Sequence, residues 1–174
     1  MYQYNIITAI KHFPGHGSST EDSHLGLVDI TDTYNEEVEL FPFKKLIEGG
    51  KTDIIMTAHI MNTNIDPDNP ATLSSIFLND ILRGRLKYEG VIVSDDMQMG
   101  AIVDNFGFEE AIIKAINAGC DLLIFSNNGR EYDDDIAEKA VEVIKKAVRE
   151  GKITEEEISS SYNRIKELKE KYYM

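Results

Sequence analysis

The chain has 174 residues, of which 42% are hydrophobic and 28% charged, a composition typical of a globular domain rather than a disordered chain. This length is sufficient for one domain with a sizeable core. The net charge of −13 and the pI near 4.7 argue against nucleic acid or an anionic membrane as a partner, because both need clustered Lys and Arg.

No apolar run approaches the roughly 20 residues of a membrane span, so we expect none. Residues 1–5 lack the basic and apolar parts of a secretory signal, which favours a cytoplasmic location. A secreted or cell-surface location stays open, because residue 1 need not be the natural start. The single cysteine, Cys120, excludes an internal disulfide and is more typical of a small buried residue than of a nucleophile.

The first part of the chain predicts two strands with a helix between them. Residues 5–10 form a short, β-branched apolar run that ends shortly before a Pro-Gly pair. In the helix that follows, Pro42 suits the first turn and Gly49 the end. Residues 53–57 are the second predicted strand. The apolar residues of the helix are Phe43, Leu46 and Ile47.

The middle of the chain continues the alternation of helices and strands. Ser74 is suited to cap a helix, and residues 90–94 form the third apolar strand. Residues 108–118 predict a helix that Gly119 ends, and residues 122–125 are the fourth strand. The apolar residues of the helix after Ser74 are Ile76, Phe77, Ile81 and Leu82.

Two further helices are predicted at the end of the chain. The first has apolar residues at the spacing of one helix face and ends at Gly151. Thr154 and Glu157 form a capping box at the start of the second. The first face consists of Ala137, Ala140, Val141, Ile144 and Val148, and the second of Ile158, Tyr162, Ile165 and Tyr172.

Continuous apolar strands separated by helices indicate an α/β fold with a parallel sheet covered on both faces. No internal repeat, low-complexity tract or linker divides the chain, so we expect a single domain over residues 1–174. The acidic run at residues 133–135 could suggest a calcium site. A solvated helix start fits it better, because acidic residues suit the positive end of a helix dipole.

Polar residues follow three of the four predicted strands. Lys11 and His12 come after the first, His59 after the second, and Asp95 and Asp96 after the third. Parallel α/β folds place their active sites at the carboxyl ends of strands. Three strands that direct chemically active residues to the same end are stronger evidence for a site than any one of them.

The loop at residues 11–24 holds three of the four histidines, and its Pro and Gly residues exclude a regular helix. Within it, Asp22 and His24 are close enough for the carboxylate to orient the imidazole. A histidine placed in this way could donate a proton to a leaving oxygen and later accept one from water. An Asp–His contact at the surface with no catalytic role is the alternative.

Asp95 and Asp96 are adjacent on extended backbone, so their carboxylates should point in different directions and have different roles. One could be a nucleophile, and a helix-capping pair is the alternative. A carboxylate nucleophile and a separate acid/base suit retaining hydrolysis of a glycoside. Two carboxylates usually share this work, whereas a histidine would take the second role here.

Four motifs stand out along the chain: KHFPGHG at residues 11–17, DSH at 22–24, PATLS at 70–74 and GVIVSDDMQMG at 90–100. They resemble motifs of the bacterial β-N-acetylglucosaminidases of glycoside hydrolase family 3, in the family's order and approximate spacing. The resemblance covers nearly the whole chain, and the first motif is highly specific.

This resemblance implies the roles of individual residues. Asp95 aligns with the catalytic nucleophile, His24 with the general acid/base and Asp22 with its dyad partner. Lys11 and His12 match residues that hold sugar hydroxyls, although a surface charge and a buried core histidine are the alternatives. The remaining histidines have lesser roles: His16 shapes the loop and His59 makes a minor sugar contact.

The resemblance also implies a substrate, a terminal β-linked N-acetylglucosamine of cell-wall muropeptides or related glycans, and no cofactor or metal. Phosphorolysis stays open, because an imidazolium repels a phosphate acceptor less than a carboxylate does. A complete (β/α)8 barrel takes about 250 residues. The chain therefore resembles the C-terminal half of such a barrel, with about four βα units plus C-terminal helices.

Half a barrel exposes strand edges and apolar surface, so we expect self-association or a partner that supplies the N-terminal half. Two other kinds of protein stay open. One is a zinc-binding domain that uses His12, His16, Asp22 and His24, although Pro14 and Gly15 prevent the usual helical spacing of zinc ligands. The other is a non-catalytic remnant or assembly module of such an enzyme.

Overall fold

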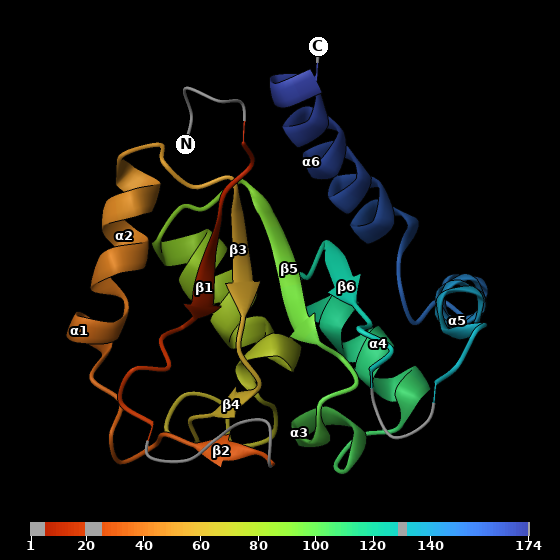
Figure 1. Ribbon diagram of the computed structural model, residues 1–174, viewed down its shortest axis with the longest axis horizontal. Helices are drawn as coiled ribbons and strands as arrows, with labels where there is room; N and C mark the ends of the chain where they lie inside the picture. Colours follow the sequence, from red (N-terminus) through yellow and green to blue (C-terminus); the bar gives the residue numbers. More distant parts are fainter. Residues whose placement is uncertain (1–5, 20–25, 129–131, 174) are drawn as a thin grey trace.

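A computed structural model describes residues 6–19, 26–128 and 132–173 of the chain. Its centre is a four-stranded, all-parallel sheet with the strand order β1-β3-β5-β6 (Figure 1). The helices that connect the strands make this an α/β fold with the arrangement of half a (β/α)8 barrel, as predicted. The four strands are β1 (Ala9–Phe13), β3 (Ile54–Thr57), β5 (Val91–Asp96) and β6 (Leu122–Ile124).

Helices occupy the intervals between the strands, and a two-stranded parallel sheet lies beyond the carboxyl ends of the main strands (Figure 1). The small sheet consists of β2 (Val28–Asp29) and β4 (Ile60–Met61). The helical elements are α1 (Glu36–Glu39), α2 (Phe41–Glu48), the 3₁₀ turn η2 (Ala71–Leu73), the π-helix η3 (Ile76–Arg85), α3 (Gly100–Val103), α4 (Phe108–Ala118), α5 (Ile136–Arg149) and α6 (Glu155–Tyr173).

The predicted helix signals have the expected geometry. The Ser74 hydroxyl accepts a hydrogen bond from the Phe77 amide at 3.3 Å and so caps η3. Gly119 ends α4 in the left-handed conformation, with φ of 114°. Thr154 and Glu157 form the predicted capping box, because the Glu157 amide donates to the Thr154 hydroxyl at 3.1 Å and the Thr154 amide donates to the Glu157 carboxylate at 2.7 Å.

The bounds of the first strand differ from the prediction. β1 begins at Ala9 and continues through Phe13, whereas the apolar run suggested residues 5–10. The strand extends further because Phe13 pairs with Thr57 of β3, so that Lys11 and His12 lie inside the strand and do not follow it. The part of the predicted strand at residue 5 lies outside the described residues.

The helices cover one face of the sheet. Along β3, Ile55 and Thr57 are fully buried, whereas Ile54 and Met56, which point to the other face, are only partly buried. No described helix lies across β1, β3 and β5 on that second face (Figure 1). Along β5, residues 91–94 are buried on both faces, so the second face is uncovered along β1 and β3, and there the prediction of a sheet covered on both faces is wrong.

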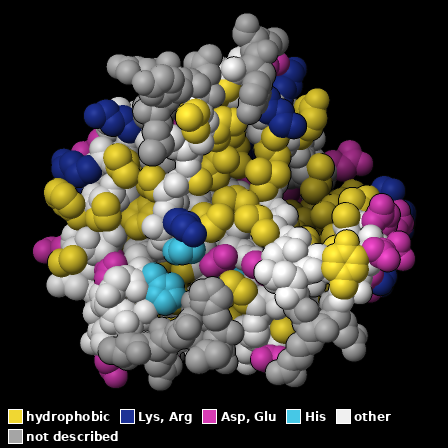
Figure 2. Space-filling view, viewed as in Figure 1, with side chains coloured by type: hydrophobic (Ala, Val, Ile, Leu, Met, Phe, Trp, Pro, Cys, Tyr) yellow, Lys and Arg dark blue, Asp and Glu magenta, His cyan; other side chains and the backbone are white. Residues whose placement is uncertain are grey.

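The uncovered face is visible as a continuous area of hydrophobic side chains (Figure 2). Basic, histidine and acidic side chains gather at its lower end, which is the end to which the strands point in Figure 1. On the covered side, the core lies between the sheet and the helices. Its largest fully buried side chains include Phe13, Phe77, Leu78, Leu82 and Ile92.

The buried face of α5 is rotated relative to the predicted one. Ala140, Val143 and Ala147 pack with α4, whereas Val141, which was predicted to be buried, is 47% exposed. Val141 instead lines an apolar groove of about 390 Å³ between β6, α5 and α6. On the far wall of this groove, Tyr162 is 63% exposed. The prediction for α5 was right for Ala140 and wrong for Ala137 and Val141, which are exposed, because the face that meets α4 is rotated around the helix. Ile144 and Val148 are partly buried at the edge of that face.

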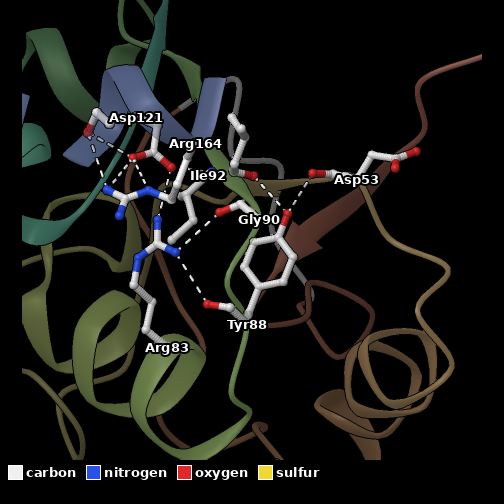
Figure 3. Close-up of polar contacts among 9 residues, drawn as sticks. Asp53, Arg83, Tyr88, Gly90, Ile92, Asp121 and Arg164 are labelled. Atoms are coloured by element: carbon white, nitrogen blue, oxygen red, sulfur yellow. Dashed lines mark hydrogen bonds and ion pairs between the residues drawn. The ribbon is translucent and has the colours of Figure 1, made fainter. Parts of the chain in front are cut away.

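The opposite end of the sheet is held together by Asp121, which directly precedes β6 and has a fully buried side chain (Figure 3). Arg164 of α6 binds one carboxylate oxygen through Nε at 2.9 Å and Nη2 at 2.7 Å. Arg83 of η3 binds the other oxygen at 2.9 Å, and the Ile92 amide donates to the same oxygen at 2.8 Å. One carboxylate therefore joins a helix from the middle of the chain, the start of β5 and the last helix.

Asp53 directly precedes β3, as Asp121 directly precedes β6. Tyr172 of α6 donates to its carboxylate at 2.6 Å, Lys171 at 2.9 Å and the Thr8 hydroxyl at 2.9 Å. Burial raises the pKa of Asp53, but these donors outweigh burial and hold the pKa below its ordinary value. The buried Tyr88 hydroxyl donates to the backbone carbonyl of Asp53 at 2.9 Å (Figure 3). Helix α6 therefore fastens the amino-terminal ends of β3 and β6.

The acidic run before α5 lies at a helix start, as predicted. Asp134 and Asp135 are exposed, and Asp133 forms an ion pair with Lys139 in the first turn of α5, at 2.6 Å. Of the helices in the described part of the chain, none is long and apolar enough to cross a membrane.

Candidate active site

The carboxyl ends of β1, β3 and β5 bring the predicted site residues of these strands to one edge of the sheet. The register between β5 and β6 shifts between Val93 and Asp96, because Val93 pairs with Leu122 and Asp96 with Ile124. The Ser94 hydroxyl accepts the hydrogen bond of the Ile124 amide at 3.0 Å within this irregularity. Bulges of this kind redirect side chains and are common beside active sites.

A second irregularity lies in β1, where Ile10 pairs with Ile55 but Phe13 pairs with Thr57. Lys11 and His12 are the two residues inside this shift. The His12 Nε2 atom lies 3.7 Å from Oδ2 of Asp95, although β3 separates their two strands. Both side chains are partly exposed, at 29% and 22%, and Lys11 is exposed beside them in sequence. A ligand at this edge could therefore meet a carboxylate, an imidazole and an ammonium group.

Asp95 and Asp96 have different surroundings, as predicted for two carboxylates that are adjacent on extended backbone. Oδ1 of Asp95 accepts the Asp96 amide at 2.8 Å, which leaves Oδ2 directed toward His12. The Asp96 carboxylate instead accepts the amides of Gln98 at 3.1 Å and Ser126 at 3.0 Å, and it also accepts the Ser126 hydroxyl. Asp96 thus ties the loops after β5 and β6 together, and Asp95 is the carboxylate that a substrate could reach.

The described start of the predicted catalytic loop packs against α1. Gly15 has φ of 125°, and a Cβ atom placed on it would lie 2.6 Å from Cβ of Glu39, so only glycine fits there. The Ser18 hydroxyl donates to the Glu39 carboxylate. His16 contacts the Ser19 hydroxyl through Nδ1 at 2.6 Å, a contact within the loop that agrees with a shaping role.

The predicted dyad of Asp22 and His24 lies outside the described residues, so its assignment stays a prediction. His59 is 1% exposed and lies behind the strand ends, where it contacts Thr72 and the backbone of Asp96. Its predicted sugar contact stays a prediction, and these contacts make it a neighbour of β5. Thr72, Gln98 and Ser126 were not singled out from the sequence, although Thr72 and Gln98 lie within the motifs at residues 70–74 and 90–100, which could have pointed to them.

The described residues contain no group of three or more His, Cys, Asp or Glu side chains that could hold a metal ion. Two of the four zinc ligands considered from the sequence, His12 and His16, have ring centroids 6.3 Å apart. The other two, Asp22 and His24, lie outside the described residues, so the zinc alternative stays a prediction.

Comparison with known proteins gives a consistent family. The sequence profile of the Glycosyl hydrolase family 3 N terminal domain matches residues 1–168. A curated relative from Tolumonas auensis, named Beta-hexosaminidase, is 42% identical over 130 residues, which are 74% of this chain and 39% of that protein.

Solved structures agree with this match. A glycoside hydrolase family 3 β-N-acetylglucosaminidase from Paenibacillus sp. str. FPU-7 aligns with a TM-score of 0.88 and 36% identity, over 98% of this chain and 32% of that one. Zinc-bound CbsA from Thermotoga neapolitana aligns with a TM-score of 0.83 and 32% identity, over 94% of this chain and 35% of that one. The chain thus spans between 32% and 39% of the lengths of these three relatives.

Proposed function

Because the chain belongs to glycoside hydrolase family 3, we propose that it supplies the nucleophile and acid/base half of a retaining β-N-acetylglucosaminidase site. The observation that carries the proposal is the position of Asp95. Its carboxylate stands at the carboxyl end of a parallel strand, with Oδ1 held by the Asp96 amide and Oδ2 directed at His12.

In the proposed reaction, Oδ2 of Asp95 attacks the anomeric carbon while His24 donates its proton to the departing glycosidic oxygen. The bond between the anomeric carbon and that oxygen breaks, and a covalent glycosyl-enzyme forms on Asp95. His24 then removes a proton from water, whose oxygen attacks the anomeric carbon and releases Asp95. Asp22 orients the imidazole and stabilises its charged form.

The proposed substrate is a glycan with a terminal β-linked N-acetylglucosamine, such as a cell-wall muropeptide. The names of the aligned relatives support this class, since they are a β-hexosaminidase and a β-N-acetylglucosaminidase. Lys11 and His12 contact sugar hydroxyls in this proposal. Their place on β1, with the His12 ring 3.7 Å from the Asp95 carboxylate, lets a sugar bound against Asp95 meet both side chains.

We further propose that a second half-barrel covers the uncovered sheet face. Three observations support such a partner: the sheet ends in two edge strands, β1 and β6; Leu122 on the edge strand is 38% exposed; and an apolar groove runs beside it. The aligned relatives have more chain beyond the matched part than this chain contains. The partner is an N-terminal half of the family's barrel.

Hydrolysis of an aryl β-N-acetylglucosaminide tests both proposals at once. We expect the chain to be poorly active alone and to become active when an N-terminal half from a relative is added, because that half completes the sugar pocket. Size-exclusion chromatography should show the two halves eluting together. A well-folded monomer that resists dilution and does not bind the added half would contradict the proposed partner. A 1:1 complex without activity would favour the alternative of a non-catalytic module.

Replacing His24 with glycine distinguishes its acid role from a structural one. In the first turnover, aryl leaving groups that need no proton should be released nearly as fast as by the wild type, whereas poor leaving groups should lose about 10²- to 10⁴-fold in rate. Pre-steady-state rates of aryl release across a series of aryl N-acetylglucosaminides of different leaving-group pKa give this comparison, because the later attack of water also needs His24. The control is His16→Gly in the same loop, for which any loss should not depend on the leaving group. An equal loss for all substrates in His24→Gly would refute the acid role.

A further inference from the structure

Behind the strand ends lies a buried set of polar side chains that the proposed reaction does not use. Thr57, His59 and Thr72 are each 1% exposed or less. His59 contacts the Thr72 hydroxyl through Nδ1 at 2.9 Å and the backbone carbonyl of Asp96 through Nε2 at 2.9 Å. The Thr57 and Thr72 hydroxyls are 2.7 Å apart. The His59 imidazole therefore joins three parts of the chain: the loop after β3, the turn η2 and the end of β5.

The contacts define which ring nitrogen of His59 carries the hydrogen. A carbonyl oxygen only accepts, so Nε2 must donate to Asp96. Burial lowers the pKa of His59 below its ordinary value, although the Asp96 carbonyl and the charges of Asp95 and Asp96 act in the opposite direction. Burial therefore disfavours the charged ring, and Nε2 carries a hydrogen in either protonation state. The Thr72 hydroxyl donates to the Ala58 carbonyl at 2.9 Å, and the same carbonyl accepts the Thr72 amide at 3.2 Å.

The backbone of Asp96 connects this ring to the nucleophile. Its carbonyl accepts from His59 and from the Met99 amide at 3.1 Å, and its own amide donates to Oδ1 of Asp95 at 2.8 Å. The irregular register between Val93 and Asp96 places this residue where the regular ladder of β5 and β6 is interrupted. Bonds from outside the ladder therefore add to the pairing of Asp96 with Ile124 in fixing the orientation of the Asp96 backbone, and with it the orientation of the Asp95 carboxylate.

We propose that His59 is a positioning residue for the nucleophile: its Nε2–H holds the Asp96 backbone so that Asp95 presents Oδ2 toward the uncovered sheet face. This rests on the proposed function of Asp95. His59 itself touches no substrate in this arrangement, because its ring is buried and both of its nitrogens are engaged.

Two substitutions of His59 separate the hydrogen bond from the packing. His59→Leu fills much of the volume but removes the donor, whereas His59→Gln retains an N–H that can reach the Asp96 carbonyl. The matched control is Ser74→Ala, since Ser74 is also fully buried and bonded to a carboxylate, that of Asp66 at 2.6 Å. The control should lose stability without a change in the chemical step.

In the assembly that hydrolyses an aryl N-acetylglucosaminide, His59→Leu should lower kcat about 10- to 100-fold with KM nearly unchanged, because a displaced nucleophile slows chemistry more than binding. His59→Gln should recover most of kcat. A drop in kcat of the same size in both His59 variants, or none in His59→Leu, would overturn the proposal.

NMR of the chain alone keeps this outcome distinct from a failure of the proposed function. The ¹⁵N signals of His59 should show a hydrogen on Nε2. The ¹³Cγ signal of Asp95 should move in His59→Leu but not in His59→Gln or Ser74→Ala. If the assembly shows no turnover, the function of Asp95 is wrong, and the NMR result still decides whether His59 orients its carboxylate. An unmoved Asp95 signal in His59→Leu would refute that role.

Discussion

Replacing Asp121 with alanine is expected to lower the free energy of unfolding by about 3–5 kcal/mol, the usual loss when one partner of a buried ion pair is removed. The Asp121 side chain is fully buried and binds two arginines, Arg83 and Arg164. Its removal leaves two guanidinium groups, which are 18% and 25% exposed, without their carboxylate. It also deprives the Ile92 amide and the Ser161 hydroxyl of an acceptor.

Urea unfolding followed by circular dichroism measures this loss as a decrease in the transition midpoint. The matched control is Asp133→Ala, which breaks an ion pair with Lys139 at the surface and should shift the midpoint far less, because solvent screens an exposed pair. If Asp121→Ala does not fold, Arg164→Ala removes a single partner and can be compared in its place. Equal midpoints for the Asp121 and Asp133 variants would show that the Asp121 cluster adds nothing to stability.

Asp95→Ala is expected to lower kcat by at least about 10³-fold in the assembly that is active, because the covalent intermediate has no other carboxylate on which to form. Adding azide should then restore glycosidic bond cleavage and give an N-acetylglucosaminyl azide of inverted configuration. The configuration inverts because the small anion attacks once, from the face that Asp95 occupied.

The control for this loss is Asp104→Ala, which removes an exposed carboxylate from the end of α3 and should leave kcat unchanged. Full turnover by Asp95→Ala would show that the nucleophile assignment is wrong. A loss of activity with unfolding in Asp95→Ala would not count as support, so circular dichroism of each variant accompanies the assay.

The order of strands and helices could be predicted because its signals are local. Gly119 and the Thr154–Glu157 capping box act within a few residues, and each ended or began a helix where expected. Asp95 could be located for a similar reason, since a carboxylate at the carboxyl end of a buried parallel strand lies at the edge where such folds place their sites, although the strand includes Asp95 and does not end before it. The position of Lys11 and His12 inside β1 was missed, because a register shift depends on the neighbouring strand.

Other features depend on contacts between distant parts of the chain. Nothing near Asp121 in the sequence indicates Arg164, which follows it by 43 residues. The orientation of α5 could not be predicted either, because both of its apolar stripes have helical spacing and only the packing of α4 selects the one that is buried. The role of Thr72 depends on the ring of His59, which approaches it from another loop.

The ties between α6 and the strands also set an order of events during synthesis. At about 5–20 residues per second, the ribosome makes Arg164 roughly 2–9 s after Asp121. Lys171 follows Asp53 by 118 residues. Until α6 is made, the Asp53 carboxylate lacks Lys171 and the Asp121 carboxylate lacks Arg164, the cations that bind them in the folded protein. The sheet therefore reaches its final stability only when the last helix has left the ribosome, and a nascent chain that stops before α6 is a substrate for chaperones and proteases.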